Sequence, residues 1–407
     1  MGRNKNHSEM RIVWARDILL DVHLHKTTEI GILQQLAEHG YEVFFVSAHS
    51  KQKTSIFQNP RIHVFSVPVG KNLPFVSRFI FTFVQFFYYI YFLIKIKPLF
   101  VVVDPDSIYG LLPTLPLYRL LKSKIILDIR STPTPILNSE SKVTIIQRLI
   151  DLSFYVAVEI AKKKLDGMTI ITDLMKKEIC NEFKIDPKWV GVWSSGVSTK
   201  LFDYEKFTGK ALELRKELGF IDKFLICYHG GFTQSRGLID TMNAISLLKD
   251  SNPAIILFLL GTGSTQTLKD MKELIRDNGL ENRIIVHEPV NFRQVPKYVA
   301  MCDVGIIPLP NLPQWRNQCP LKLLEYLAMK KVVILTDIPC HREIVGDSEC
   351  GVYSPSTRPD DIARSIVFAY DNKERLQDWG AKGRFLIENE YTWEKVSEKL
   401  ENYLRKL

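Results

Sequence analysis

The sequence lacks the cysteine pattern of a disulfide-bonded or zinc-binding protein. Its six cysteines, spread over 407 residues, form no Cys-x-x-Cys pair and no regular framework. Reduced thiols in a cytosolic setting are therefore the default expectation. The histidines show no three-ligand metal spacing either. The sequence predicts no metal site.

A signal peptide and a nucleic-acid-binding signature are also missing. Residues 1–10 are polar, and the apolar run that follows them is short, so no signal peptide is expected. The chain has a net charge of +9 but no dense Lys/Arg run. Positive charge without such a run favours a membrane surface or a nucleotide over nucleic acid as the anionic partner.

One apolar segment departs from the pattern of a plain soluble protein. Residues 79–94, between Arg78 and Lys95, carry no charge and are rich in Phe and Tyr. The segment is shorter than the roughly 20 apolar residues of a membrane span. Polar residues recur in it at helical spacing: Arg78, Thr82, Gln85 and Tyr89. The pattern favours a helix lying in the membrane interface, flanked by lysines. A buried core helix and a true span remain the alternatives.

The length and the alternation of apolar strands with helical patterns predict two α/β domains with parallel sheets. Regular alternation pauses near Gly191–Gly196 and resumes at Lys223. We therefore expect an N-terminal domain over residues 1–200, with the apolar helix near 75–97. A second domain is expected over 201–390, and an amphipathic helix over 391–407. The expected strands are Arg11–Arg16, Tyr41–Ser47, Leu99–Val103, Lys124–Asp128, Gly167–Ile171, Lys223–His229, Ala254–Leu260, Arg283–Val286, Val304–Ile307 and Lys331–Leu335.

The most informative motif is the helix start that follows the predicted strand 302–308. Lys322 and Glu325 are three residues apart and so lie on one face of a helix. The N-terminus of a helix after a strand is a natural anion site. Lys322 could hold a phosphate there, and Glu325 a sugar hydroxyl. A surface Lys–Glu pair on a core helix is the plainer interpretation.

Two glycine-rich turns follow strands in the second half. Gly230 and Gly231 precede Arg236, whose guanidinium can bind two phosphate oxygens at once. Gly261 and Gly263 form a second turn, which a tight strand-to-helix connection explains without any ligand. The first turn predicts a phosphate cradle of backbone N–H groups, completed by the charge of Arg236, and the second is a candidate donor-site turn with that plain alternative.

In the N-terminal half, Asp128 and Arg130 stand at the end of a predicted strand. The carboxyl ends of parallel strands face the ligand crevice in open α/β sheets. Asp128 and Arg130 are therefore candidates for contact with the reacting sugar. A structural pairing of Asp128 with Arg130 is the alternative. His23 and His25, in the loop after the first strand, are further candidates for binding an acceptor or a phosphate.

The segment from Asn317 to Glu325 resembles the nucleotide-sugar signature of the retaining family-4 glycosyltransferases. It is similar to a variant branch with a Pro-Leu-Lys-Leu-Leu-Glu-Tyr core. The resemblance assigns Glu325 to the second signature glutamate, which binds the nucleotide ribose. Asn317 stands where the first glutamate would be, and Pro320, followed by Leu321, replaces the turn glycine. In the other loop, Gly231 occupies an arginine position and Arg236 a lysine position, so Lys322 is expected to compensate for the missing cation.

The resemblance implies the GT-B fold: two Rossmann-like domains facing a central cleft, with the C-terminal helix crossing back to the first. It implies a glycosyltransferase that moves a sugar from a nucleotide-diphosphate sugar to a hydroxyl with retention, without a cofactor. Arg236 and Lys322 would stabilise the leaving diphosphate. The aromatic segment suggests a lipid-linked or cell-surface glycan acceptor at the cytosolic membrane face, and so a cytoplasmic, peripherally membrane-associated protein. A nucleotide-sugar epimerase and a non-catalytic scaffold subunit are the alternatives.

Overall fold

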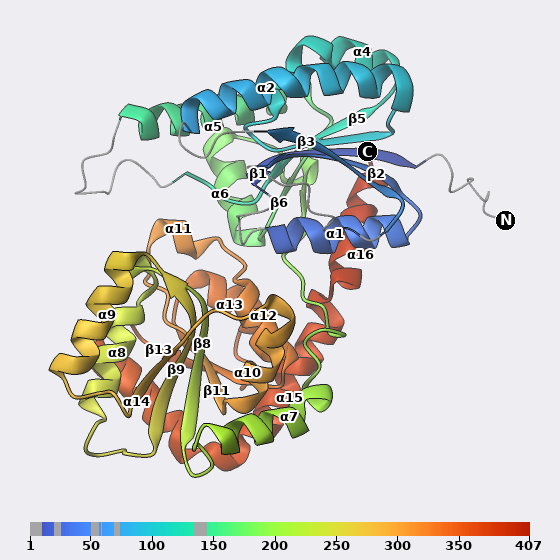
Figure 1. Ribbon diagram of the computed structural model, residues 1–407. Helices are drawn as coiled ribbons and strands as arrows, with labels where there is room; N and C mark the ends of the chain where they lie inside the picture. Colours follow the sequence, from blue (N-terminus) through green and yellow to red (C-terminus); the bar gives the residue numbers. More distant parts are fainter. Residues whose placement is uncertain (1–9, 20–25, 50–56, 58, 69–73, 134–144) are drawn as a thin grey trace. The chain divides into compact units, whose positions relative to one another are not determined.

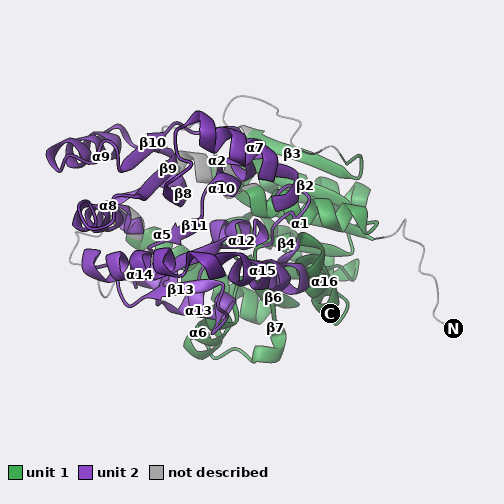
Figure 2. Ribbon diagram, turned by 90° about the horizontal axis from the view of Figure 1, so that it is seen from below, with its two compact units in different colours: residues 1–195, 393–407 green, residues 196–392 purple. Residues whose placement is uncertain are grey.

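The computed structural model describes residues 10–19, 26–49, 57, 59–68, 74–133 and 145–407. The chain divides into two compact units (Figure 2): Met1–Ser195 together with Trp393–Leu407, and Gly196–Thr392. The first unit ends close to residue 200, where the sequence places the domain boundary. The histidines at 23 and 25 lie outside the described residues.

The first unit is built on a parallel sheet of seven strands in the order β3-β2-β1-β4-β5-β6-β7. Residues of β4 and β5 are almost all buried, as expected for strands covered by helices on both faces. The strands are β1 Arg11–Leu19, β2 Glu42–His49, β3 Ile62–Pro68, β4 Phe100–Val103, β5 Lys124–Ile129, β6 Gly167–Ile170 and β7 Val190–Val192.

Helices cover this sheet, and the last of them comes from the C-terminus of the chain. The helix α16 lies beside α1 (Figure 1), and His39 contacts Glu401 across this pair. Tyr403 accepts from the backbone N–H of Met168 and donates to the carbonyl of Trp189. The helices are α1 Lys26–Glu38, α2 Pro74–Tyr91, the π-helical η2 Phe92–Ile96, α3 Ile108–Leu111, α4 Leu115–Leu120, α5 Ile145–Lys164, α6 Asp173–Phe183 and α16 Trp393–Leu404.

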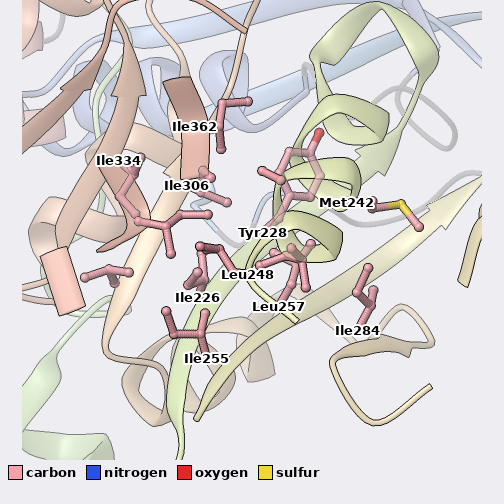
Figure 3. Close-up of a cluster of buried hydrophobic side chains, with 14 of the residues drawn as sticks. Ile226, Tyr228, Met242, Leu248, Ile255, Leu257, Ile284, Ile306, Ile334 and Ile362 are labelled. Atoms are coloured by element: carbon pink, nitrogen blue, oxygen red, sulfur yellow. The ribbon is translucent and has the colours of Figure 1, made fainter. Parts of the chain in front are cut away.

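The second unit has its own parallel sheet, in the order β10-β9-β8-β11-β12-β13. Aliphatic side chains of β8, β9, β11 and β12 pack against helix α8 (Figure 3). The strands are β8 Phe224–Phe232, β9 Ile255–Gly263, β10 Ile284–His287, β11 Val304–Ile307, β12 Val332–Thr336 and β13 Gly351–Ser354. The helices are α7 Tyr204–Glu217, η6 Gln234–Arg236, α8 Leu238–Leu247, α9 Thr265–Asp277, α10 Val295–Met301, α11 Pro313–Arg316, α12 Leu321–Ala328, α13 Pro339–Val345, α14 Pro359–Asp371, α15 Leu376–Leu386 and η9 Ile387–Tyr391.

The predicted fold class is confirmed: each unit is a Rossmann-like layered structure with a parallel sheet. The order of each sheet doubles back at its first strand, β1 in the first unit and β8 in the second. A sheet that reverses in this way opens a crevice at the carboxyl ends of the strands beside the reversal. In the second unit those ends belong to β8 and β11.

Two residues of the polar stripe predicted on the apolar helix, Gln85 and Tyr89, face the core of the first unit. The amide of Gln85 donates to Ser107, and Tyr89 donates to the Ser107 carbonyl. The opposite side of α2 and η2 exposes six apolar residues: Phe79, Ile80, Phe83, Phe87, Tyr91 and Ile94. The alternative of a buried core helix is therefore wrong, because only 22% of the apolar window Phe79–Ile96 is buried.

Candidate functional site

Two glycines precede the last residue of strand β8 and bring its backbone close to strand β9. Gly230 lies opposite Gly261 in the parallel register. Both have positive φ, 111° at Gly230 and 151° at Gly261, a region that residues with a side chain rarely adopt. A Cβ on Gly261 would also lie 2.0 Å from the carbonyl oxygen of Gly230. Glycine at both positions is thus required for the close approach of β8 and β9 at their carboxyl ends.

Lys322, in the first turn of α12, extends over the end of β8. Its Nζ lies 3.8 Å from the centre of the Tyr228 ring. The same Nζ is 3.5 Å from the position that a Cβ at Gly230 would occupy. Burial lowers the pKa of Lys322, and the nearby charge of Arg236 adds to the effect. The ammonium is therefore held by an aromatic face beside exposed backbone of a glycine turn.

Arg236 ends the short helix η6, which follows the Gly230–Gly231 turn. Its guanidinium lies 5.1 Å from the ring centre of Trp315, on α11. Trp315 is fixed in turn, because its indole N–H donates to the carbonyl of Ser235. Within the described part of the chain, neither Arg236 nor Lys322 forms a salt bridge with a carboxylate. Two cations that form no salt bridge among the described residues, at the carboxyl end of the sheet, make a site for a multivalent anion.

Glu325 is buried one turn along α12 from Lys322. Burial raises the pKa of Glu325 to about 7, although the Lys322 charge opposes the shift. Its Oε2 lies 3.3 Å from Nε2 of His229, on β8. This contact is not an ion pair, because burial lowers the pKa of His229 to about 3 and leaves the ring neutral. A carboxyl group therefore stands beside the two cations, as the motif predicts.

Tyr326 fixes α12 against the end of β8. Its hydroxyl donates to the carbonyl of Cys227 at 2.8 Å and accepts from the backbone N–H of His229 at 3.1 Å. Its ring occupies the space above Gly305, where a Cβ would come within 2.6 Å of it. These contacts set the position of the whole first half of α12, and so of the side chains at 322 and 325.

The remaining predicted donor-site residues flank this cluster. Pro320 is the N-cap residue of α12, and no side chain caps this helix end, which leaves first-turn N–H groups available to an anion. Leu321 begins the helix, and Asn317 is buried just before it. Gly231 faces open space, whereas Gly263 packs closely on the Phe232 carbonyl. The structure therefore places the predicted donor-site residues at or beside one sheet edge.

The other two predicted residues, Asp128 and Arg130, belong to the first unit. Asp128 is buried, and both of its carboxylate oxygens are occupied: Oδ2 by Arg16 at 2.9 Å, and Oδ1 by Thr169 and the indole of Trp193. Asp128 thus pairs with Arg16, not with Arg130 as the sequence suggests.

Arg130 instead donates to the carbonyl of Trp193, and its guanidinium lies 3.6 Å from the centre of that ring. Arg16 also bonds Glu29 at 2.9 Å. The pKa of Glu29 is raised by burial, against the charges of Arg16 and Arg130. These contacts favour the structural alternative for Asp128, with Arg16 as its partner, which the sequence cannot identify because Arg16 is 112 residues away.

Four residues of the cluster in the second unit escape prediction: Tyr228, His229, Trp315 and Tyr326. Tyr228 and His229 lie in the last half of β8, directly before Gly230 and Gly231. Their place near the carboxyl end of a strand could have marked them in the sequence, since ligands bind beyond strand ends. Tyr326 and Trp315 act by contacts between distant segments, which no local pattern shows.

Comparison with known families identifies the part of the chain that holds this cluster. Residues 211–385 match the family model described as glycosyl transferases group 1. This segment is similar to the glycosyl transferases of group 1. The segment contains β8, η6 and α12, and with them Arg236, Lys322 and Glu325.

The curated relatives of this chain have low sequence identity to it. An uncharacterised glycosyltransferase of Methanocaldococcus jannaschii is 23% identical over 248 residues, which cover 60% of each chain. The putative teichuronic acid biosynthesis glycosyltransferase TuaH of Bacillus subtilis is 26% identical over 180 residues, 44% of this chain and 42% of TuaH. The alignments thus span from about two fifths to three fifths of these relatives' lengths.

Solved structures match the fold over nearly the whole chain. Anabaena HepE, solved in complex with UDP, gives a TM-score of 0.75 at 12% identity and covers 98% of this chain and 100% of that one. WaaG, described as a glycosyltransferase involved in lipopolysaccharide biosynthesis, gives 0.69 at 13% identity, covering 96% and 98%. The two Rossmann-like units therefore have the fold of GT-B glycosyltransferases.

Proposed function

We propose that this protein is a glycosyltransferase of the retaining, family-4 type, which takes its sugar from a nucleotide-diphosphate donor. The observation that carries the proposal is the Lys322 ammonium, which lies over Tyr228 beside Gly230 and forms no salt bridge among the described residues. A partly desolvated cation in such a place has most to gain from a phosphate ligand. The group 1 domain match supports the same conclusion.

In this proposal the diphosphate lies between Lys322, Arg236 and the uncapped start of α12. Negative charge grows on the leaving diphosphate as the bond to the sugar breaks, so fixed cations lower the barrier. These cations supply the charge that a divalent metal would otherwise supply, and we propose that activity does not need one. Glu325 accepts hydrogen bonds from the ribose hydroxyls in its ionised form.

Retention follows if the acceptor oxygen attacks on the face from which the diphosphate leaves. The new bond joins the acceptor oxygen to the anomeric carbon, and the bond from that carbon to the phosphate oxygen breaks. The departing phosphate oxygen takes the proton of the acceptor hydroxyl. No separate base is then required.

The acceptor side of the proposal rests on the outer face of the first unit. Phe79 of α2 is 72% exposed, and Leu120 of α4 is 79% exposed. Helix α4 is joined to α2 by a hydrogen bond from the Tyr118 hydroxyl to the Tyr89 carbonyl. Exposed basic residues border this surface: Lys95, Lys97, Arg119 and Lys122. An apolar face with a basic border fits an anionic lipid surface.

We therefore propose that the protein is cytoplasmic and binds peripherally to the membrane, where it glycosylates a lipid-linked or cell-surface glycan. A peripheral position agrees with the hydrogen bonds of Gln85 and Tyr89, which tie α2 to the first unit and would break if the helix spanned the bilayer. TuaH and WaaG, whose names refer to teichuronic acid and lipopolysaccharide biosynthesis, support a cell-surface glycan acceptor.

The proposal is tested by measuring release of nucleoside diphosphate from UDP-, GDP- and ADP-sugars, with and without a membrane extract as acceptor source. Acceptor-dependent release that EDTA does not abolish, and a product with the anomeric configuration of the donor, are expected. Conversion of the donor without any acceptor would instead indicate an epimerase. Absence of turnover with every donor and extract would favour the scaffold subunit.

A further inference from the structure

His229 and Glu325 approach each other inside the proposed donor site, although they come from a strand and a helix far apart in the sequence. Nε2 of His229 lies 3.3 Å from Oε2 of Glu325, and both side chains are buried. Within the described residues, this Nε2 makes no hydrogen bond of normal geometry. A buried polar nitrogen without a hydrogen bond is costly, so its position beside the carboxyl group calls for a role.

The His229 ring is held in place by Tyr326. The ring centres lie 4.9 Å apart in an edge-to-face arrangement, and the backbone N–H of His229 donates to the Tyr326 hydroxyl. The hydroxyl also donates to the Cys227 carbonyl. Since Tyr326 follows Glu325 directly, the imidazole and the carboxyl group are built into one rigid junction between β8 and α12.

Few other titratable groups face Glu325. Lys322 lies on its own helix and Tyr228 on β8 beside it. Arg236 acts on Lys322 from η6. The strands β11 and β12, which pack on α12, carry no titratable side chain.

The other elements packed on α12 are α15 and η9. From α15, Arg384 donates to the carbonyl of Ala328, at the far end of α12. The two acidic residues of η9, Glu388 and Glu390, are exposed. The pKa of Glu325 is therefore set by burial and by the charge of Lys322, and the neutral ring of His229 lies 3.3 Å from its Oε2.

We propose that His229 is a positioning residue of the donor site: its Nε2 and Oε2 of Glu325 are 3.3 Å apart, so a small rotation of the ring aligns the neutral Nε2–H to donate to one oxygen of the ionised Glu325 carboxylate and leaves the other for the ribose hydroxyls. This inference rests on the proposed function. A hydrogen bond to the charged form favours ionisation of a buried carboxyl group. Without that donor, Glu325 would keep its proton near neutral pH and lose acceptor capacity towards the ribose.

Two substitutions separate this role from simple packing. His229→Gln keeps an N–H donor near the position of Nε2, whereas His229→Phe keeps a ring against Tyr326 but no donor. Ionisation of Glu325 is followed in the ligand-free protein by infrared difference spectra against Glu325→Gln. We expect the titration to move up by about one pH unit in His229→Phe and to stay close to the wild-type position in His229→Gln.

The same proteins are titrated with UDP-glucose between pH 6 and 9. UDP-glucose suits this purpose because, unlike a terminal phosphate with a pKa near 6, its diphosphate does not titrate in this range. At pH 7 the His229→Phe protein should bind about fivefold more weakly than wild type, with the loss recovered at high pH. The Glu325→Gln protein should bind weakly at every pH. Unchanged titration and unchanged affinity in His229→Phe would overturn the proposal.

A second measurement needs no substitution. Nitrogen NMR of histidine-labelled wild-type protein reports which ring nitrogen of His229 carries the proton. The proposal requires the proton on Nε2, and a bare Nε2 would overturn it. Failure of UDP-, GDP- and ADP-glucose alike to bind would contradict the proposed function, whereas the infrared and NMR measurements on the free protein would still decide the His229–Glu325 pair.

Discussion

The ammonium of Lys322 lies 3.8 Å from the ring centre of Tyr228, over the last residues of β8. An attraction of this kind holds a cation without neutralising it. The charge therefore remains available to a ligand at the glycine turn. Gly231 stands at a position where the family that the sequence resembles has arginine. With Lys322 in this place, the chain still has two cations, Lys322 and Arg236, at the carboxyl end of the sheet.

Lys322→Met should lower kcat for sugar transfer by about 100-fold, because it removes a donor aimed at the leaving diphosphate. Methionine keeps the length of the side chain and its packing on Tyr228. Steady-state release of nucleoside diphosphate checks the prediction. Lys269→Met, on exposed α9, is the matched control and should retain activity. Equal activity of the two variants would remove Lys322 from the mechanism.

The buried carboxyl group of Glu325 makes stability depend on pH. Its pKa is raised from 4.5 to about 7 in the folded protein, so the folded chain binds more protons than the unfolded chain between these values. The contribution of this group to the free energy of unfolding is fully present below pH 4.5 and is lost as the pH rises through 7.

Glu325→Gln abolishes this dependence, since glutamine does not titrate. The stability of the variant relative to wild type should therefore increase between pH 5 and 8, by about 3 kcal/mol at most. Chemical denaturation at a series of pH values provides the measurement. The exposed Glu273→Gln serves as control, and a difference that stays constant across this range would contradict the raised pKa.

Asp128→Asn should destabilise the first unit by about 3 kcal/mol, because it removes one of the two carboxylates that compensate the buried charge of Arg16. Differential scanning calorimetry should show a lower melting temperature. The exposed Asp277→Asn should melt like the wild-type protein. Normal stability combined with lost activity would instead return Asp128 to the catalytic role that the sequence suggests.

Substitutions at Gly261 and Gly231 test how closely β8 and β9 approach at their carboxyl ends. Gly261→Ala places a methyl group 2.0 Å from the Gly230 carbonyl oxygen in a backbone conformation with positive φ, and should cost roughly 3 kcal/mol. Gly231→Ala meets only open space and should stay within about 0.5 kcal/mol of wild type. Denaturant unfolding distinguishes them. Equal stabilities would show that β8 and β9 do not approach as closely as described.

Liposome co-sedimentation tests the outer face of α2. Phe83→Glu and Phe87→Glu should each release the protein from anionic vesicles, because a carboxylate on this face opposes both burial and charge attraction. Both positions are exposed, so folding should not change. Phe385→Glu, equally exposed in the second unit, should bind vesicles as wild type does. Wild-type protein that remains in the supernatant would contradict membrane binding.

The sequence predicts the central strands well, because strands such as β11 and β12 are continuous apolar runs buried on both faces. It misses β3, β7 and β13. All three are edge strands, and β13 alternates between buried and partly exposed residues, which weakens the apolar signal.

At the site, the sequence predicts what one helix holds and misses what tertiary packing adds. Lys322 and Glu325 share a helix face, so their spacing alone brings them together. His229 reaches Glu325 only because β8 and α12 meet, and Asp128 finds Arg16 only because β1 and β5 flank β4. The outward orientation of the aromatic face of α2 is likewise set by packing, since Gln85 finds its partner Ser107 in a later segment.

The central claim is that the end of β8 and the start of α12 bind a nucleotide sugar, and thermal denaturation with UDP-, GDP- and ADP-glucose tests it most directly. A ligand that binds only the folded chain stabilises it by about 2.7 kcal/mol at 100 times its Kd. We predict a clear rise in melting temperature with one of the three, lost in Arg236→Ala and Glu325→Ala. No rise with any of them, or a rise that both variants retain, would contradict the claim.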